Sequence, residues 1–106
     1  MSILKKFSEA LDNSNEEAMN ECLHDDYAFT NYSQGKVFNK IEVIKWAMSG
    51  DIKREKVRVL YENDKVGVEH AIVSFNDGNK QAVLAFFTFK DGKIHTLETG
   101  ATNLQK

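Results

Sequence analysis

The chain has 106 residues, of which 42% are hydrophobic and 28% charged, and its formal net charge is −2. Its length allows one domain with one core, and its composition excludes a disordered chain. The charge provides no basic field for nucleic acid or an anionic membrane, and no apolar run approaches the ~20 residues that span a bilayer.

The first part of the chain has the 3.6-residue periodicity of helices. A first helix is predicted from apolar residues at helical spacing, which are Ile3, Leu4, Phe7 and Leu11. The polar run at 12–15 ends this helix. Ser14 and Glu17 have the spacing of a capping box, in which each side chain satisfies a free backbone N–H group. We therefore expect a second, short helix to begin at Ser14.

A strand and a third helix are predicted next. Residues 27–32 alternate as a strand, with one side formed by Tyr27, Phe29 and Asn31. Asn39 followed by Glu42 indicates the start of a helix, and Gly50 indicates its end. The buried stripe of this helix is expected to hold Ile41, Ile44, Ala47 and Met48.

The periodicity then changes from 3.6 to 2, which is typical of strands. Four antiparallel strands are predicted, at 55–62, 66–75, 81–89 and 93–101, joined by turns rich in Asn, Asp and Gly. The third of them is apolar on both faces. We expect one face to meet the helices and the other to meet a second subunit, in a homodimer formed through Ile72, Leu84 and Phe86. The alternative is a central strand covered by loops.

Two segments carry a resemblance to a known family. They are Glu-Cys-Leu-His-Asp-Asp-Tyr-Ala-Phe at 21–29 and Phe-Lys-Asp-Gly-Lys-Ile at 89–94. With the order of the elements, they resemble the nuclear transport factor 2-like superfamily, and within it the small bacterial SnoaL-like members. The resemblance implies one α+β domain over 1–106, in which N-terminal helices pack on a curved, mainly antiparallel sheet. The resulting cone would hold an apolar pocket open at one end.

The resemblance also allows a test for the chemistry of ketosteroid isomerases, which are relatives in this superfamily. Those enzymes use a tyrosine and a protonated aspartate as hydrogen-bond donors and a second aspartate as the base. The matching positions hold Phe7, Ala85 and Asn31, respectively. Phenylalanine and alanine cannot donate a hydrogen bond, and asparagine cannot take up a proton at neutral pH. The sequence therefore argues against that reaction.

His95 is a candidate catalytic residue, because imidazole titrates near neutrality. Its orientation depends on the turn at 90–92. If the turn is a two-residue Asp-Gly loop, His95 faces away from Phe87; if it is a type I turn plus a bulge, the two share a side. The resemblance favours the bulge, which would place His95 and Thr99 in the cone.

Glu69 is the second candidate catalytic residue, because it lies on the more apolar side of its strand. A carboxyl group in an apolar cone has a raised pKa and can act as an acid or a base. The alternative is a glutamate at the sheet margin that reaches solvent. Asn31 has two interpretations as well: it orients a ligand, or it stabilises the turn after its strand. The expected ligand-binding residues are Phe7, Phe29, Asn31, Trp46, Val73, Ala85, Phe87, Leu97 and Thr99.

The three histidines lie on different predicted elements and lack the spacing of a metal site, and no phosphate-binding loop is present. We therefore expect no metal and no cofactor. The single cysteine, Cys22, is consistent with a cytoplasmic location. The leading hypothesis is a non-catalytic domain that binds a small apolar ligand. The alternatives are an acid–base enzyme of isomerase, dehydratase or cyclase type that uses His95, and a protein–protein interaction module.

Overall fold

The computed structural model describes residues 2–32 and 34–104, which form three helices and six strands. The helices are α1 (Ile3–Asp12), α2 (Glu16–Cys22) and α3 (Lys40–Met48). The strands are β1 (Leu23–Asn31), β2 (Lys36–Asn39), β3 (Ile52–Glu62), β4 (Val66–Phe75), β5 (Lys80–Lys90) and β6 (Lys93–Asn103). None of the helices in this part of the chain is long and apolar enough to cross a bilayer.

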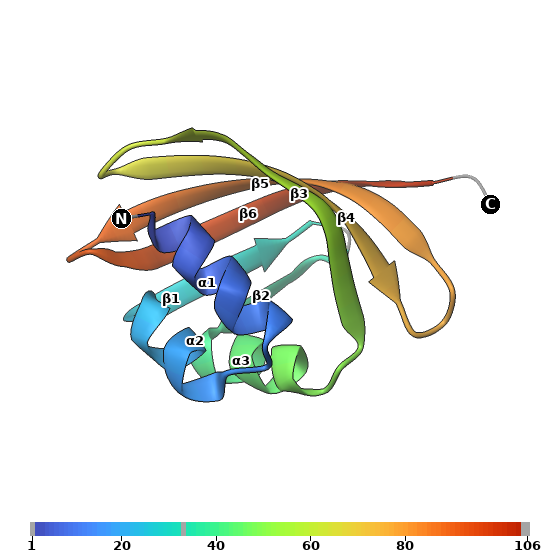
Figure 1. The fold of residues 1–106 in the computed structure, drawn as a ribbon, viewed down its shortest axis with the longest axis horizontal. Coiled ribbons are helices and arrows are strands. Elements are labelled where there is room, and N and C mark those ends of the chain that lie inside the picture. The colour runs from blue at the N-terminus through green and yellow to red at the C-terminus, as the bar shows by residue number, and fades with distance from the viewer. Residues whose placement is uncertain (1, 33, 105–106) are drawn as a thin grey trace.

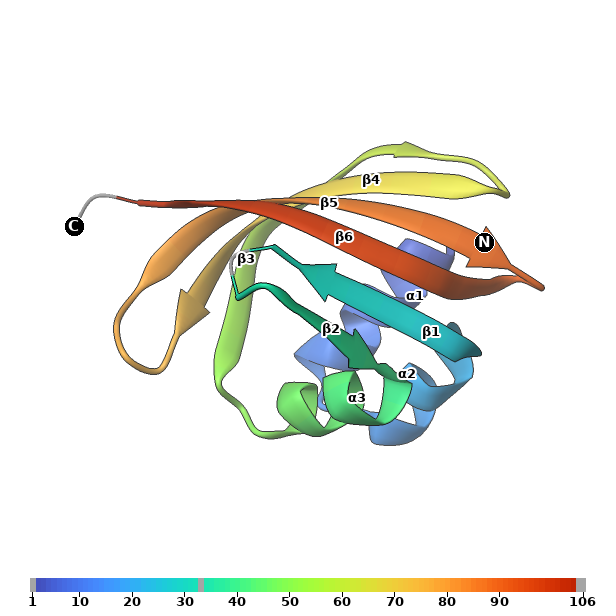
Figure 2. The same cartoon turned by 180° about the vertical axis from the view of Figure 1, so that it is seen from behind.

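The six strands of the described residues form one curved sheet in the order β2-β1-β6-β5-β4-β3. All neighbours are antiparallel except β1 and β6, which run parallel. Figures 1 and 2 show the sheet arching over the three helices, which all lie on its inner face. The predicted α+β fold with a mainly antiparallel curved sheet is thus confirmed. The four antiparallel strands predicted in the second half of the chain are β3 to β6, and β1 and β2 extend the same sheet beyond β6.

The N-terminus of α3 is capped as the sequence predicts, whereas that of α2 is capped by a different residue. The capping box of α3 is present, since the Asn39 side chain accepts from the backbone N–H of Glu42 and the Glu42 side chain accepts from the backbone N–H of Asn39. The expected cap of α2 at Ser14 was wrong. Asn15 caps α2 by accepting from the N–H of Ala18 at 3.1 Å, because Ser14 turns the chain with a positive φ of 50°.

The buried side of α3 is rotated from the predicted stripe. Val43 and Ile44 are buried, whereas Ile41 is 77% exposed and Met48 is also exposed. Ile41 and Met48 face a shallow groove beside α2, and α2 has only seven residues and is too short to cover them. The sheet therefore decides which side of α3 is buried.

The core is densest at one end of the cone. Its most deeply buried side chains come from α1, α2, β1 and β6 and are Leu4, Met19, Cys22, Leu23 and Ile94. We call this region the closed end. The C-terminal residues of β1 and the corresponding part of β6, Asn31, Thr99 and Ala101, are only half-buried, and we call their region the open end.

Candidate ligand-binding pocket

A pocket of about 130 Å³ lies between α1, α3 and the inner face of the sheet. Seven of the residues predicted for ligand binding line it: Phe7, Phe29, Asn31, Trp46, Val73, Leu97 and Thr99. Ala85 and Phe87 do not line it; both are packed into the core. Helix α1 therefore supplies one wall, α3 a second wall, and strands β1, β4 and β6 the floor.

The pocket has further lining residues that the sequence did not single out. The apolar ones are Leu11, Val43, Ala47, Ile52, Phe75, Val83 and Ala101, and the polar ones are Tyr27 and Gln81. Tyr27 alternates with Phe29 and Asn31 along β1, so its side of the strand was predictable. Of the described residues around the pocket, none carries a charge. The pocket is thus an apolar hollow with a few neutral polar groups.

Tyr27 has an unusual environment in this pocket. It is only 3% exposed, and its hydroxyl has no hydrogen-bond partner within the part of the chain that the structure describes. Burial raises the pKa of the Tyr27 phenol, so the hydroxyl stays protonated. A buried hydroxyl without a partner costs about 1–3 kcal/mol, which a phenylalanine at the same place would avoid.

Asn31 makes the turn contact that one interpretation of the sequence expected. Its side-chain oxygen accepts from the backbone N–H of Gln34 at 3.3 Å. Asn31 also lies directly opposite Thr99 in the parallel pairing of β1 with β6. Two neutral polar side chains thus stand next to each other at the open end of the pocket.

The hairpin between β5 and β6 differs from both predicted alternatives. Asp91 and Gly92 have positive φ values of 55° and 75° and form a two-residue loop between paired Lys90 and Lys93. Further along, Phe89 pairs with Ile94 and Thr88 with Thr96, so the register skips His95. This bulge puts Leu97 and Thr99 on the pocket side, as the second alternative expected. His95 itself is not among the residues that line the pocket.

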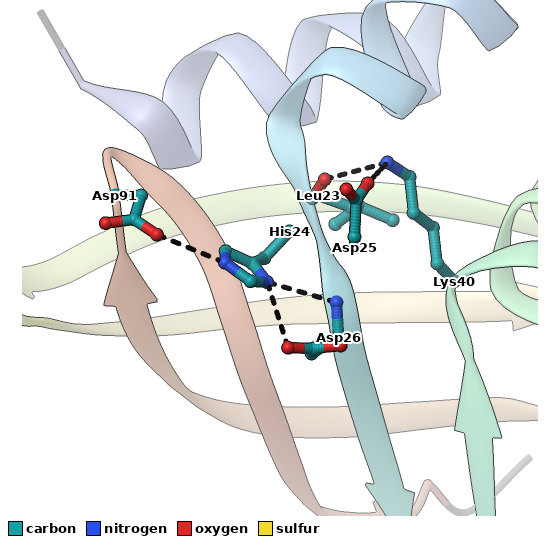
Figure 3. Close-up of polar contacts among 6 residues, drawn as sticks. All are labelled: Leu23, His24, Asp25, Asp26, Lys40 and Asp91. Atoms are coloured by element: carbon teal, nitrogen blue, oxygen red, sulfur yellow. Dashed lines mark hydrogen bonds and ion pairs between the residues drawn. The ribbon is translucent and has the colours of Figure 1, made fainter.

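His95 instead lies beside His24 near the closed end. Their ring centroids are 5.2 Å apart in an edge-to-face arrangement. As Figure 3 shows, His24 Nδ1 accepts from the backbone N–H of Asp26 at 3.0 Å, and Nε2 lies 3.3 Å from Asp91 Oδ2. Because Nδ1 accepts, the ring proton is on Nε2 and is donated to Asp91. His24 thereby ties β1 to the β5–β6 turn.

Lys40 makes a similar link on the other side of β1 (Figure 3). Its Nζ donates to the backbone oxygen of Leu23 at 2.9 Å and lies 3.4 Å from Asp25 Oδ1. The start of α3 is therefore fastened to the start of β1. Within residues 2–32 and 34–104, no three His, Cys, Asp or Glu side chains are grouped as a metal site would require.

Glu69 is buried beneath α1, outside the pocket lining. It is 5% exposed and forms an ion pair with Arg54, which also donates to Ser8 Oγ of α1 at 3.2 Å. Burial raises the pKa of the Glu69 carboxyl, and the adjacent Arg54 guanidinium opposes that rise. The contact holds β3 and β4 to α1.

Solved structures with the same arrangement of helices and sheet provide the comparison. An NTF2-like protein of unknown function from Cytophaga hutchinsonii superposes with a TM-score of 0.81, at 14% identity over 94% of this chain and 87% of that one. The chain has the nuclear transport factor 2-like fold. The resemblance predicted from the sequence is thus confirmed at the level of the fold.

Other structures of this fold have names that suggest chemistry. A candidate ketosteroid isomerase from Kribbella flavida has a TM-score of 0.81 at 12% identity, covering 98% of this chain and 78% of that one. A candidate polyketide cyclase from Sinorhizobium meliloti has a TM-score of 0.76 at 20% identity, covering 92% and 93%. No family model and no curated protein sequence matches the chain. At these identities the likeness shows the nuclear transport factor 2-like fold and no activity.

Proposed function

We propose that this protein binds a small, largely apolar organic molecule in the pocket between α1, α3 and the sheet. The observation that carries the proposal is the apolar, uncharged lining of a hollow that the packed closed end does not fill. Its volume of about 130 Å³ limits the ligand. Drug-sized ligands occupy pockets of about 300–1,000 Å³, and an apolar cavity of about 150 Å³ accepts benzene. The ligand is therefore the size of a single ring.

Binding without catalysis is the role that the lining supports best. The neutral polar groups at the pocket, on Tyr27, Asn31, Gln81 and Thr99, do not titrate near neutral pH. A general acid or base would have to lie within hydrogen-bond reach of the ligand. An acid–base role for His95 or Glu69 stays a prediction, and their positions outside the lining favour the binding role.

Trp46 provides a direct test of the proposal, since it is the only tryptophan of the chain and lines the pocket. Toluene is titrated while the indole N–H signal of Trp46 is followed by nitrogen-edited NMR. We expect a saturable shift in the wild type. Ala101→Leu, which fills the pocket, should abolish the shift, whereas Ala82→Leu on the other face of the sheet should preserve it. If toluene leaves the Trp46 signal of the wild type unchanged, the binding proposal fails.

We also propose that a second copy of this chain covers the outer face of the sheet. All three helices in the described residues lie on the inner face, so the outer side chains of the central strands have no cover from their own chain (Figure 2). Leu84 and Phe86 of β5 are 50% and 41% exposed there, and Ile72 of β4 is half-buried. Exposed apolar side chains on central strands are typical of an interface.

Sedimentation velocity at micromolar concentration tests the second copy. We expect a dimer for the wild type and a monomer for Phe86→Lys. Val37→Lys is the control, because Val37 is also an exposed apolar residue, at 64% exposure, but lies on the edge strand β2. A wild-type chain that sediments as a monomer would contradict the dimer.

A further inference from the structure

Trp46 of α3 borders two hollows. One is the apolar pocket of about 130 Å³ inside the cone. The other is a wider outer hollow of about 430 Å³, formed by α3, the end of β1 and a residue of β2. Among the described residues that line these hollows, Trp46 and Asn31 border both. The half-buried Trp46 side chain is therefore part of the wall between them.

A hydrogen bond holds the Trp46 indole in this wall. Its Nε1–H donates to Asp51 Oδ2 at 3.2 Å. Asp51 follows Gly50, whose φ of 77° changes the direction of the chain after α3 and brings the Asp51 carboxylate back to the end of the helix. The other carboxylate oxygen accepts from the backbone N–H of Asn76, after β4, at 3.4 Å. The indole is thus fastened through Asp51 to the turn between β4 and β5.

We infer that Asp51 sets the size limit of the pocket by holding the Trp46 indole in place. The inference rests on the proposed binding function and specifies which ligands the pocket excludes. With the hydrogen bond intact, the pocket has room for one ring. Once the bond is broken, the indole can turn into the outer hollow, and the volume that it leaves is added to the pocket. Asp51 does not line the pocket, so it is a positioning residue that acts through Trp46.

The hydrogen bond is strong enough to select between ligands. A hydrogen bond to a carboxylate is roughly twice as strong as one between neutral groups. A ligand that needs the indole turned away binds only to the fraction of molecules in that state, and its affinity is reduced by that fraction. The bond should therefore weaken the binding of a two-ring ligand by about tenfold, while a one-ring ligand binds without breaking it.

Toluene and naphthalene test the size limit, because both are apolar and planar and naphthalene has one more fused ring. Their affinities are measured by ligand-observed NMR. We expect the wild type to bind naphthalene about tenfold more weakly than toluene, and Asp51→Ala to shift this ratio toward naphthalene by about tenfold. Asp51→Asn keeps a side-chain oxygen that accepts from the indole, so it should retain most of the preference for toluene.

Asp77→Ala is the matched control for a general loosening of the turn between β4 and β5. Asp77 lies in that turn and accepts from the backbone N–H of Asn79 at 3.0 Å. Its removal weakens the turn and leaves the hydrogen bond between Trp46 and Asp51 in place, so the ratio of the two affinities should stay as in the wild type.

A second measurement needs no variant. The exchange of the Trp46 indole N–H with solvent is measured by NMR in the wild type with each probe bound. We expect faster exchange with naphthalene than with toluene, because naphthalene requires the indole to leave Asp51. This measurement decides the matter if Asp51→Ala does not fold.

The outcomes separate this inference from the proposed function. A shift toward naphthalene in Asp51→Ala that is absent in Asp77→Ala, together with the faster indole exchange, supports the inference. It is overturned, with the binding proposal intact, if the wild type binds naphthalene as tightly as toluene, if both variants shift the ratio alike or not at all, or if naphthalene leaves the indole exchange slow. If the wild type binds neither probe, the proposed function itself fails.

Discussion

The two ends of the cone are built by the same two strands and differ in how they are filled. At the closed end, Leu23 of β1 lies opposite Ile94 of β6, and both are fully buried. At the open end of the same strand pair, Asn31 lies opposite Thr99, and both line the pocket. A single parallel strand pairing thus supplies dense packing at one end and a hollow at the other. The difference suggests that stability and binding are separable in this molecule.

Polar contacts follow the same division. His24 and Lys40 fasten β1 to its neighbours at the closed end, through Asp91 and the backbone oxygen of Leu23 (Figure 3). The buried Tyr27 hydroxyl, by contrast, has no hydrogen-bond partner among residues 2–32 and 34–104.

The largest expected effect comes from replacing a leucine by alanine, once at each end of the cone. Leu23→Ala removes a fully buried side chain from the closed end and should lower the free energy of unfolding by about 3–5 kcal/mol, since it leaves a cavity. Leu97→Ala removes a half-buried side chain that already borders the pocket, and should cost about 1–2 kcal/mol. Urea denaturation measures both values. Equal losses would show that the two ends are equally important for stability.

A second matched pair adds a methyl group instead of removing one. A Cβ at Gly67 would lie 2.7 Å from Leu4 Cδ1 and 2.9 Å from Phe89 Cζ, in the packed closed end. Gly67→Ala should therefore cost about 1–3 kcal/mol by overpacking. A Cβ at Gly100 meets nothing within 4 Å, so Gly100→Ala should be neutral or stabilise the fold by up to about 1 kcal/mol.

Thermal denaturation of the two glycine variants, run side by side, is the measurement. The melting temperature should fall for Gly67→Ala and stay level or rise for Gly100→Ala. A melting temperature for Gly67→Ala equal to that of the wild type would mean that Leu4 and Phe89 can move aside, and that the closed end is less rigid than its burial indicates.

Much of the fold was predictable from the sequence because its local signals agree with the tertiary structure. The change from helical to strand periodicity and the Asn39–Glu42 capping box formed as expected, and Asp91-Gly92 forms a hairpin turn although the pairing beyond it differs from both predicted alternatives. Strand β2 was missed, because four residues at a sheet edge carry too little alternation to be recognised. The buried side of α3 was misjudged, because the sheet and not the helix sequence determines it.

The candidate site was predictable as a set of apolar walls but not in its polar details. The bulge at His95 depends on the register in which β6 pairs with β5. A one-residue slip would change that register and leave the sequence pattern of both strands the same. The lack of a partner for the Tyr27 hydroxyl among the described residues is a property of its surroundings and has no signature in the sequence. Arg54 reaches Glu69 from a neighbouring strand, and nothing in the charged run at 53–58 marks Arg54 as the residue that turns inward.

The smallest expected effect concerns the buried Glu69–Arg54 pair, which lies under α1 and outside the pocket. Burial raises the pKa of Glu69 above its unfolded value of about 4.3. The folded state then binds the proton more tightly than the unfolded state, so the contribution of Glu69 to stability is greatest below that unfolded pKa and is lost as the pH rises through the folded pKa. Glu69→Gln keeps the shape and removes the titration.

Urea denaturation at a series of pH values upward from about 4 measures the unfolding free energies of the wild type and of Glu69→Gln. As the pH rises, the wild type should therefore lose stability relative to Glu69→Gln. Arg54→Met is the control. It removes the guanidinium that opposes the pKa rise, so the same comparison in its background should depend on pH more steeply. A difference that is flat with pH would mean that Arg54 cancels the effect of burial, and that this pair stabilises the α1 side of the cone as a fully ionised contact.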